Sequence, residues 1–144
     1  MEEEERFGKN KLEEMMIPNN APFFCFIGRD PTYLETVYPN LSMDYHNYRD
    51  MDIKDFIPSV NELTERGYFA FRMGKKVQEK LKIDNVKFFD YANKFRTDFL
   101  DIFLCAKCKF FISGNAGFDG VPMTVFRRPT VIVNMVPISL IRGW

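Results

Sequence analysis

Histidine and cysteine are scarce in this sequence of 144 residues, which contains one of the first and three of the second. The single histidine, His46, would have to serve in any Ser-His-Asp or Cys-His arrangement, so hydrolytic triads are excluded unless it does. Three cysteines, an odd number with no secretory leader ahead of them, fit a reducing compartment. We therefore expect a cytoplasmic protein.

Long apolar runs and an excess of one charge are also missing. No run approaches the ~20 apolar residues that a membrane-spanning helix needs, so we expect no transmembrane segment. Twenty Lys and Arg residues balance 20 Asp and Glu residues, which leaves no overall field to attract nucleic acid. We expect no nucleic-acid partner, and any anion site must be local. The GxGxxG and Walker glycine fingerprints are absent as well.

Apolar and aromatic side chains, in contrast, are plentiful. Hydrophobic residues make up 46% of the chain and include 16 Phe, which indicates a packed core rather than disorder. Short apolar runs predict five buried strands, at residues 23–28, 68–73, 86–89, 109–112 and 130–133. Helices are predicted at residues 11–17, from about 53 to 66, at 99–106 and at 121–126, and residues 31–51 resemble a loop.

This alternation predicts an α/β fold, an open and mostly parallel Rossmann-like sheet of about five strands with helices on both faces. We expect a charged, helical N-terminal extension over residues 1–20 and one α/β domain over residues 21–144. Thr97 is the expected N-cap of the helix at 99–106. Pro58 and Gly67 should lie in the first turn and at the end of the helix before the second strand.

The sharpest local signal is the turn after the fourth predicted strand, Ser113-Gly114-Asn115-Ala116-Gly117. Glycines let the backbone approach a ligand closely, and a helix directly behind them would present free N–H groups to a phosphate. The turn also follows a parallel strand, at the edge where open α/β sheets bind ligands. The alternative is that these glycines only make a tight connection.

Arg29 and Arg72 each lie at the end of a predicted buried strand. If the strands are parallel, both guanidinium groups emerge at the same edge as the glycine-bearing turn, where they could bind phosphate in bidentate fashion. Alternatively, each pairs with a carboxylate, for example Arg29 with Asp30 or Asp90. Asp101, alone in an apolar helix, could accept from a ligand hydroxyl, hold Arg72, or complement the helix N-terminus.

Cys105 and Cys108 form a CxxC pair, which raises a redox or zinc interpretation. The pair lies at the C-terminal end of a predicted helix, the pole that disfavours thiolate. A structural zinc site needs four ligands, and only Cys25 and His46 remain to complete it. We therefore favour a packing role for both cysteines, and we expect no metal site.

Four segments together resemble a family of bacterial glycosyltransferases. They are CFIGRDPTYL (25–34), NYRDMDIKDFIPSVNELTERGYFAFRMGK (47–75), DYANKFRTDFLDIFLCAKCKFFISGNAG (90–117) and VPMTVFRRPTVIVN (121–134). The likeness is to the fucosyltransferase-like branch of GT-B enzymes, whose C-terminal half binds a nucleoside-diphosphate sugar. The relatives often carry His where this chain has Gly28.

The resemblance implies that Arg29 and Arg72 contact the donor diphosphate, and that Asp101 and the turn at 113–117 border the nucleotide. It also implies sugar transfer without a bound metal or other cofactor. The glycan acceptor would be held by an upstream domain, for which this chain has no room. The resulting hypothesis is a donor-binding half of a glycosyltransferase in surface polysaccharide or glycan synthesis. The alternative is a nucleotide-sugar or phosphate-binding module without turnover. We also expect that the chain can self-associate through the face that the missing half leaves open.

Overall fold

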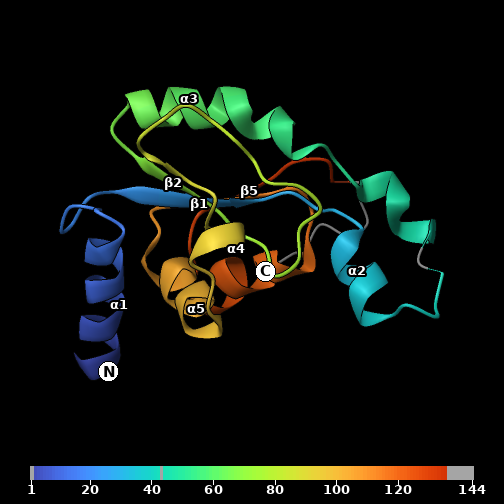
Figure 1. Cartoon of the computed structure of the whole chain (residues 1–144), viewed down its shortest axis with the longest axis horizontal. Helices are drawn as coiled ribbons and strands as arrows, with labels where there is room; N and C mark the ends of the chain where they lie inside the picture. Colours follow the sequence, from blue (N-terminus) through green and yellow to red (C-terminus); the bar gives the residue numbers. More distant parts are fainter. Residues whose placement is uncertain (1, 43, 136–144) are drawn as a thin grey trace.

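The structure, a computed structural model, describes residues 2–42 and 44–135, without the side chains of residues 44–46. Its centre is one open sheet of five parallel strands in the order β3-β2-β1-β4-β5 (Figure 1). The strands are β1 (Phe23–Ile27), β2 (Phe69–Arg72), β3 (Phe88–Phe89), β4 (Phe111–Ser113) and β5 (Thr130–Ile132). The predicted α/β class, strand number and parallel arrangement are confirmed.

Strand β1 lies in the middle of the sheet because its sequence tolerates burial on both faces. All five of its residues are buried, as in parallel sheets whose two faces are covered by helices. Cys25 is in register with Phe71 of β2 on one side and with Phe111 of β4 on the other. The ends of these three strands therefore meet at one edge.

Helices cover both faces of the sheet, as predicted (Figure 1). On one face, η2 (Ile53–Phe56) and α3 (Ile57–Glu65) pack Phe56 and Val60 against Phe24 and Phe26 of β1. On the other face lie α4 (Tyr91–Lys94) and α5 (Asp98–Lys107). Alternate residues of β1 point to opposite faces, so one strand serves both core clusters.

Three features predicted at helix ends are confirmed. The Thr97 hydroxyl accepts a hydrogen bond from the Leu100 N–H at 3.1 Å and so caps α5. Pro58 lies in the first turn of α3, where its missing N–H costs nothing. Gly67 follows that helix with φ of +99°, a conformation that L side chains rarely adopt.

The N-terminal extension is a longer helix than predicted. Helix α1 spans Glu2–Glu14, whereas apolar spacing alone indicated a helix only at residues 11–17. It packs on α5, where Gly8 lies against the Phe103 ring and Phe7 makes an edge-to-face contact with Phe99 at 5.1 Å. Contacts between segments distant in sequence therefore support helix formation here.

The stretch predicted as a loop, residues 31–51, contains two short helices instead. They are α2 (Thr32–Val37) and the 3₁₀ helix η1 (Asp44–Arg49). Helix α2 has no buried residue, so it lacks the apolar face from which sequence periodicity could predict it. Among the described residues, no helix is both long and apolar enough to cross a membrane.

Candidate functional site

A cleft of about 600 Å³ lies outside the carboxyl ends of the central strands. Strands β2 and β3 follow on one side of β1, whereas β4 and β5 lie on its other side, so the order of strand addition switches between β1 and β4. Open α/β sheets bind their ligands at this switch point. The cleft is lined there by Gly28 and Arg29 after β1, Gly74 after β2, and Ala116 and Gly117 after β4.

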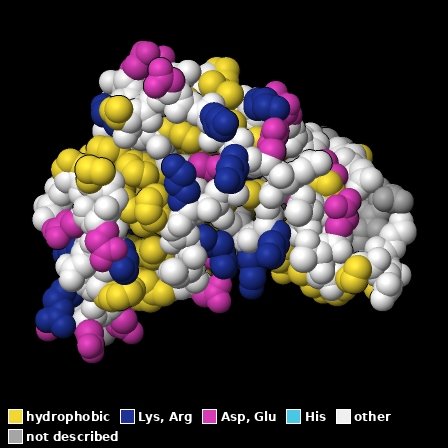
Figure 2. All heavy atoms as spheres, in the orientation of Figure 1, with side chains coloured by type: hydrophobic (Ala, Val, Ile, Leu, Met, Phe, Trp, Pro, Cys, Tyr) yellow, Lys and Arg dark blue, Asp and Glu magenta, His cyan; other side chains and the backbone are white. Residues whose placement is uncertain are grey.

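Two helices complete the walls of the cleft. Helix α5 contributes Asp98, Asp101 and Ile102 from its first turns, and α2 contributes Tyr33 and Leu34. Figure 2 shows Lys and Arg side chains gathered around a hollow between the sheet and the segment that contains α2. Apolar side chains lie on that segment. The cleft thus combines cationic and apolar walls.

Arg29 lines this cleft directly after β1, at the sheet edge where it was predicted. Its Nε lies 3.2 Å from Asp50 Oδ1, and its side chain is 11% exposed. Burial, together with the charge of Arg49, lowers the pKa of Arg29, while burial raises the pKa of Asp50. The partner is Asp50 rather than either carboxylate considered from the sequence.

Arg72 reaches the same sheet edge, but its side chain is only 2% exposed. Its Nη1 donates to the carbonyl oxygen of Glu79 at 2.6 Å and to Asp90 Oδ1 at 3.4 Å. Arg72 does not line the main cleft; it lines a smaller neighbouring pocket of about 380 Å³, together with Arg29. The structure therefore brings the two arginines together around this smaller pocket.

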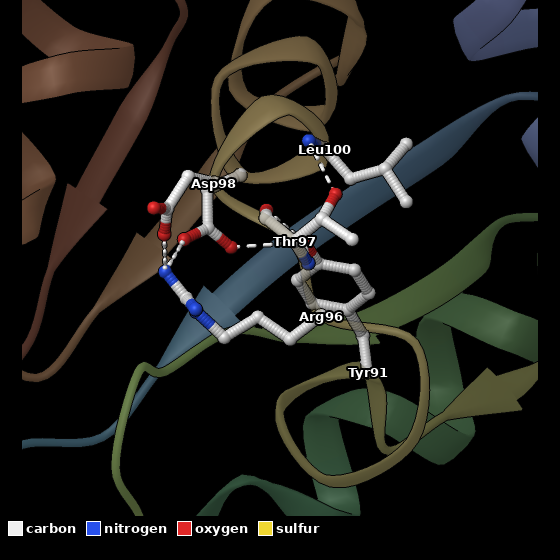
Figure 3. Close-up of polar contacts among 6 residues, drawn as sticks. Tyr91, Arg96, Thr97, Asp98 and Leu100 are labelled. Carbon is white, nitrogen blue, oxygen red and sulfur yellow. Dashed lines mark hydrogen bonds and ion pairs between the residues drawn. The ribbon is translucent and has the colours of Figure 1, made fainter.

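Figure 3 shows a polar network at the start of α5, with Tyr91, Arg96 and Asp98 labelled. Asp101 is the residue that joins most of its members. Its Oδ1 accepts from the Tyr91 hydroxyl at 2.9 Å, and its Oδ2 lies 2.7 Å from Nη2 of Arg96. Arg96 also pairs with Asp98. Burial raises the pKa of Asp101, against the opposing effects of Tyr91 and Arg96. Its arginine partner is thus Arg96, and the suggested contact with Arg72 is not made.

The turn after β4 is only partly available to a ligand. Ser113 is fully buried, and its hydroxyl donates to Asp119 Oδ2 at 3.0 Å. A Cβ on Gly114 would lie 2.1 Å from the Met51 sulfur, so any other residue here would displace the Met51 side chain. Asn115 has a left-handed backbone with φ of +57°. The second half of the turn, Ala116 and Gly117, reaches the cleft.

The segment behind this turn is not a regular α-helix. A 3₁₀ turn, η3 (Gly117–Asp119), is followed by a π-helical turn, Val121–Val125, where an ordinary short helix was predicted. Pro122 removes one N–H near its start. Such short turns have only a small macrodipole. We therefore no longer expect a helix N-terminus behind this turn to contribute to anion binding.

The two lysines that follow β2, Lys75 and Lys76, were not predicted as site residues. Both side chains are exposed, both line the cleft, and neither forms an ion pair with a described residue. Lys75 acts on Asp98 at longer range: the pKa of Asp98 is lowered first by Arg96 and then by Lys75. The signal was present in the sequence, because Gly74-Lys75-Lys76 directly follows a predicted buried strand.

The remaining candidates lie away from the cleft or outside the description. Cys25, Cys105 and Cys108 are free thiols, all three completely buried in one core cluster. Burial raises the pKa of Cys25 and Cys105. Among residues 2–42 and 44–135, no three metal-binding side chains group together. The side chain of His46 is not among those described.

The arrangement can hold a ligand of nucleotide size that carries negative charge at one part and an apolar or planar surface at another. Comparisons of the chain with protein-family models, with curated proteins and with solved structures found no match.

Proposed function

We propose that this chain binds the nucleoside-diphosphate sugar donor of a glycosyltransferase that makes surface polysaccharide or other glycans. The observation that carries the proposal is the cleft of about 600 Å³ at the switch point between β1 and β4, with Lys75 and Lys76 on its wall and not ion-paired with any described residue. The motifs that resemble GT-B glycosyltransferases supply the substrate class. In this proposal another domain holds the glycan acceptor.

The size and charge of the cleft support a nucleoside diphosphate over a bare phosphate. Its volume lies in the range of sites for small organic ligands, roughly 300–1,000 Å³. Arg29 and Arg96 already have carboxylate partners, so the lysines are the cations that a diphosphate would recruit. The apolar side chains Tyr33 and Phe118 offer a surface for the nucleoside.

During sugar transfer, the bond between the anomeric carbon and the diphosphate breaks, and negative charge develops on the departing phosphate oxygen. Cations fixed beside that oxygen stabilise the transition state more than the ground state. We assign this role to Lys75 and Lys76, with Arg29 at the floor. Metal-free transfer is part of the proposal, since the lysines would supply the positive charge.

The proposal is tested by a thermal-shift screen of the chain with UDP- and GDP-sugars. A ligand at 100 times its dissociation constant stabilises the folded state by about 2.7 kcal/mol, which raises Tm by roughly 5–10 °C for a domain of this size. We expect such a shift with one nucleotide class, and its loss in a Lys75→Ala/Lys76→Ala variant.

Arg66→Ala is the matched control. Arg66 follows the exposed end of α3 and lines neither cavity, and among the residues that the structure describes its one ion pair is with Glu62 at 2.6 Å. This variant should respond to the ligand as the parent chain does. The proposal is wrong if no nucleotide sugar shifts the Tm of the folded chain, or if the two lysines can be removed without reducing the shift.

A further inference from the structure

A second pocket of about 380 Å³ adjoins the cleft. The two cavities share Gly28, Arg29 and Asp30, the three residues that directly follow β1. A ligand held in the cleft with its phosphates near Arg29 could therefore extend past this shared wall into the smaller pocket. The side pocket is the place in the fold where the group attached to the diphosphate would lie.

The two cavities differ in the charge of their unshared walls. The side pocket carries three carboxylates beyond the shared wall, Asp50, Asp52 and Glu79, against one arginine, Arg72. Two of them have cationic partners, since Asp50 pairs with Arg29 and Glu79 pairs with Lys54 at 3.0 Å, but carboxylates still outnumber cations on this wall. The main cleft has three cations, Lys75, Lys76 and Arg96, against Asp98 and Asp101. A phosphate fits the cleft better, whereas a group that donates hydrogen bonds fits the side pocket better.

Arg72 brings to the side pocket a buried donor that no described residue satisfies, as is also the case for Nε of Arg96 and Arg128 elsewhere. Its side chain is 2% exposed, and Nη1 is occupied by Glu79 and Asp90. Its Nε, in contrast, is buried without a hydrogen-bond partner among the described residues. A buried donor left unsatisfied is costly, and a ligand hydroxyl or ring oxygen in the pocket would satisfy it.

We propose that the side pocket beneath Arg29 is the sugar subsite and that it selects neutral, hydroxyl-rich sugars over acidic ones, an inference that rests on the proposed function. Sugar hydroxyls can donate to the carboxylates and accept from Arg72. A uronic acid would instead place a further negative charge among Asp50, Asp52 and Glu79. Like charges brought together in a partly desolvated pocket repel each other strongly enough to decide between two sugars.

The test compares sugar nucleotides that differ only in oxidation at C6. The uridine set is UDP, UDP-glucose and UDP-glucuronate, and the guanosine set is GDP, GDP-mannose and GDP-mannuronate, each titrated calorimetrically into the intact chain. We expect the neutral sugar nucleotide to bind at least about tenfold more tightly than its uronate.

The key variant is Asp52→Asn/Glu79→Gln, which removes two carboxylates from the pocket. Asn caps a helix about as well as Asp, so the hydrogen bond that Asp52 accepts from the Lys54 N–H is kept. The Glu79 carbonyl oxygen that holds Arg72 is unaffected, because it belongs to the backbone. Glu62→Gln on α3, outside both cavities, is the matched control for the loss of a surface carboxylate.

In the double variant, the preference for the neutral sugar should fall at least about threefold, while the affinity for free UDP or GDP stays within about twofold. The control should keep the parent preference. If the free diphosphate binds but the two sugars bind equally well, or the double variant keeps the full preference, the sugar subsite is refuted and donor binding stands. If neither free diphosphate binds, both proposals are refuted.

Discussion

Two carboxylates bind the same arginine at the start of α5, and we expect only one of them to matter for stability. Asp101 is 9% exposed and holds both Arg96 and the buried Tyr91, whereas the side chain of Asp98 is 82% exposed. In Asp101→Ala, Tyr91 retains the Thr97 carbonyl oxygen 3.0 Å away as an acceptor, and Arg96 retains Asp98. The expected loss is therefore about 2 kcal/mol, below that for breaking an isolated buried pair.

Urea unfolding followed by circular dichroism measures this difference directly. A loss of 2 kcal/mol lowers the urea midpoint by roughly 1 M when the m-value is about 2 kcal/mol/M. Asp98→Ala should leave the unfolding midpoint almost unchanged, because an exposed ion pair is screened by water and salt. If Asp98→Ala destabilises the chain as much as Asp101→Ala does, the reasoning from burial is wrong.

Three further predictions follow from burial and close packing. Gly8→Ala should destabilise the chain by about 1 kcal/mol in urea unfolding. The new Cβ would lie 2.2 Å from the Phe103 ring, and this clash costs more than the gain in helix propensity. A stabilised variant would contradict this. The three buried cysteines should react with a thiol reagent in denaturant but not in the native state, and fast native labelling would contradict their placement. Because burial raises the pKa of Asp101 above its ordinary value of 3.8, the folded chain binds its proton more tightly than the unfolded chain does. The stability of the parent relative to Asp101→Asn should therefore fall as pH rises from 3.8 through the raised pKa, and a rise in that window would contradict the sign.

Buried periodic segments were predictable from sequence, and weakly buried ones were not. Strand β1 and helix α5 carry apolar patterns and capping residues that agree with their environments, and Thr97 caps α5 as predicted. Helix α2 has no buried residue, and α1 meets the domain partly through a glycine, which carries no apolar signal. Such helices depend on tertiary context that a sequence pattern does not contain.

The location of the site was predictable, but the partners of its charged groups were not. Parallel strands bring Arg29, Arg72 and the turn at 113–117 to one edge, as expected from their order. Which carboxylate meets which arginine depends on loop conformations that apolar periodicity does not determine, so Asp50 and Arg96 were not identified as partners. Lys75 and Lys76 were not predicted, because the expected pattern of arginines and glycines at strand ends does not include lysines.

The most direct test of the account is the calorimetric titration of UDP and GDP, without sugar, into the parent chain and the Lys75→Ala/Lys76→Ala variant. The account predicts one site for one of the two nucleotides. Its affinity should fall at least about tenfold in the variant and should weaken as salt is raised. Absence of binding by both nucleotides, or equal affinity in the parent and the variant, would contradict a diphosphate site at the switch point of the sheet.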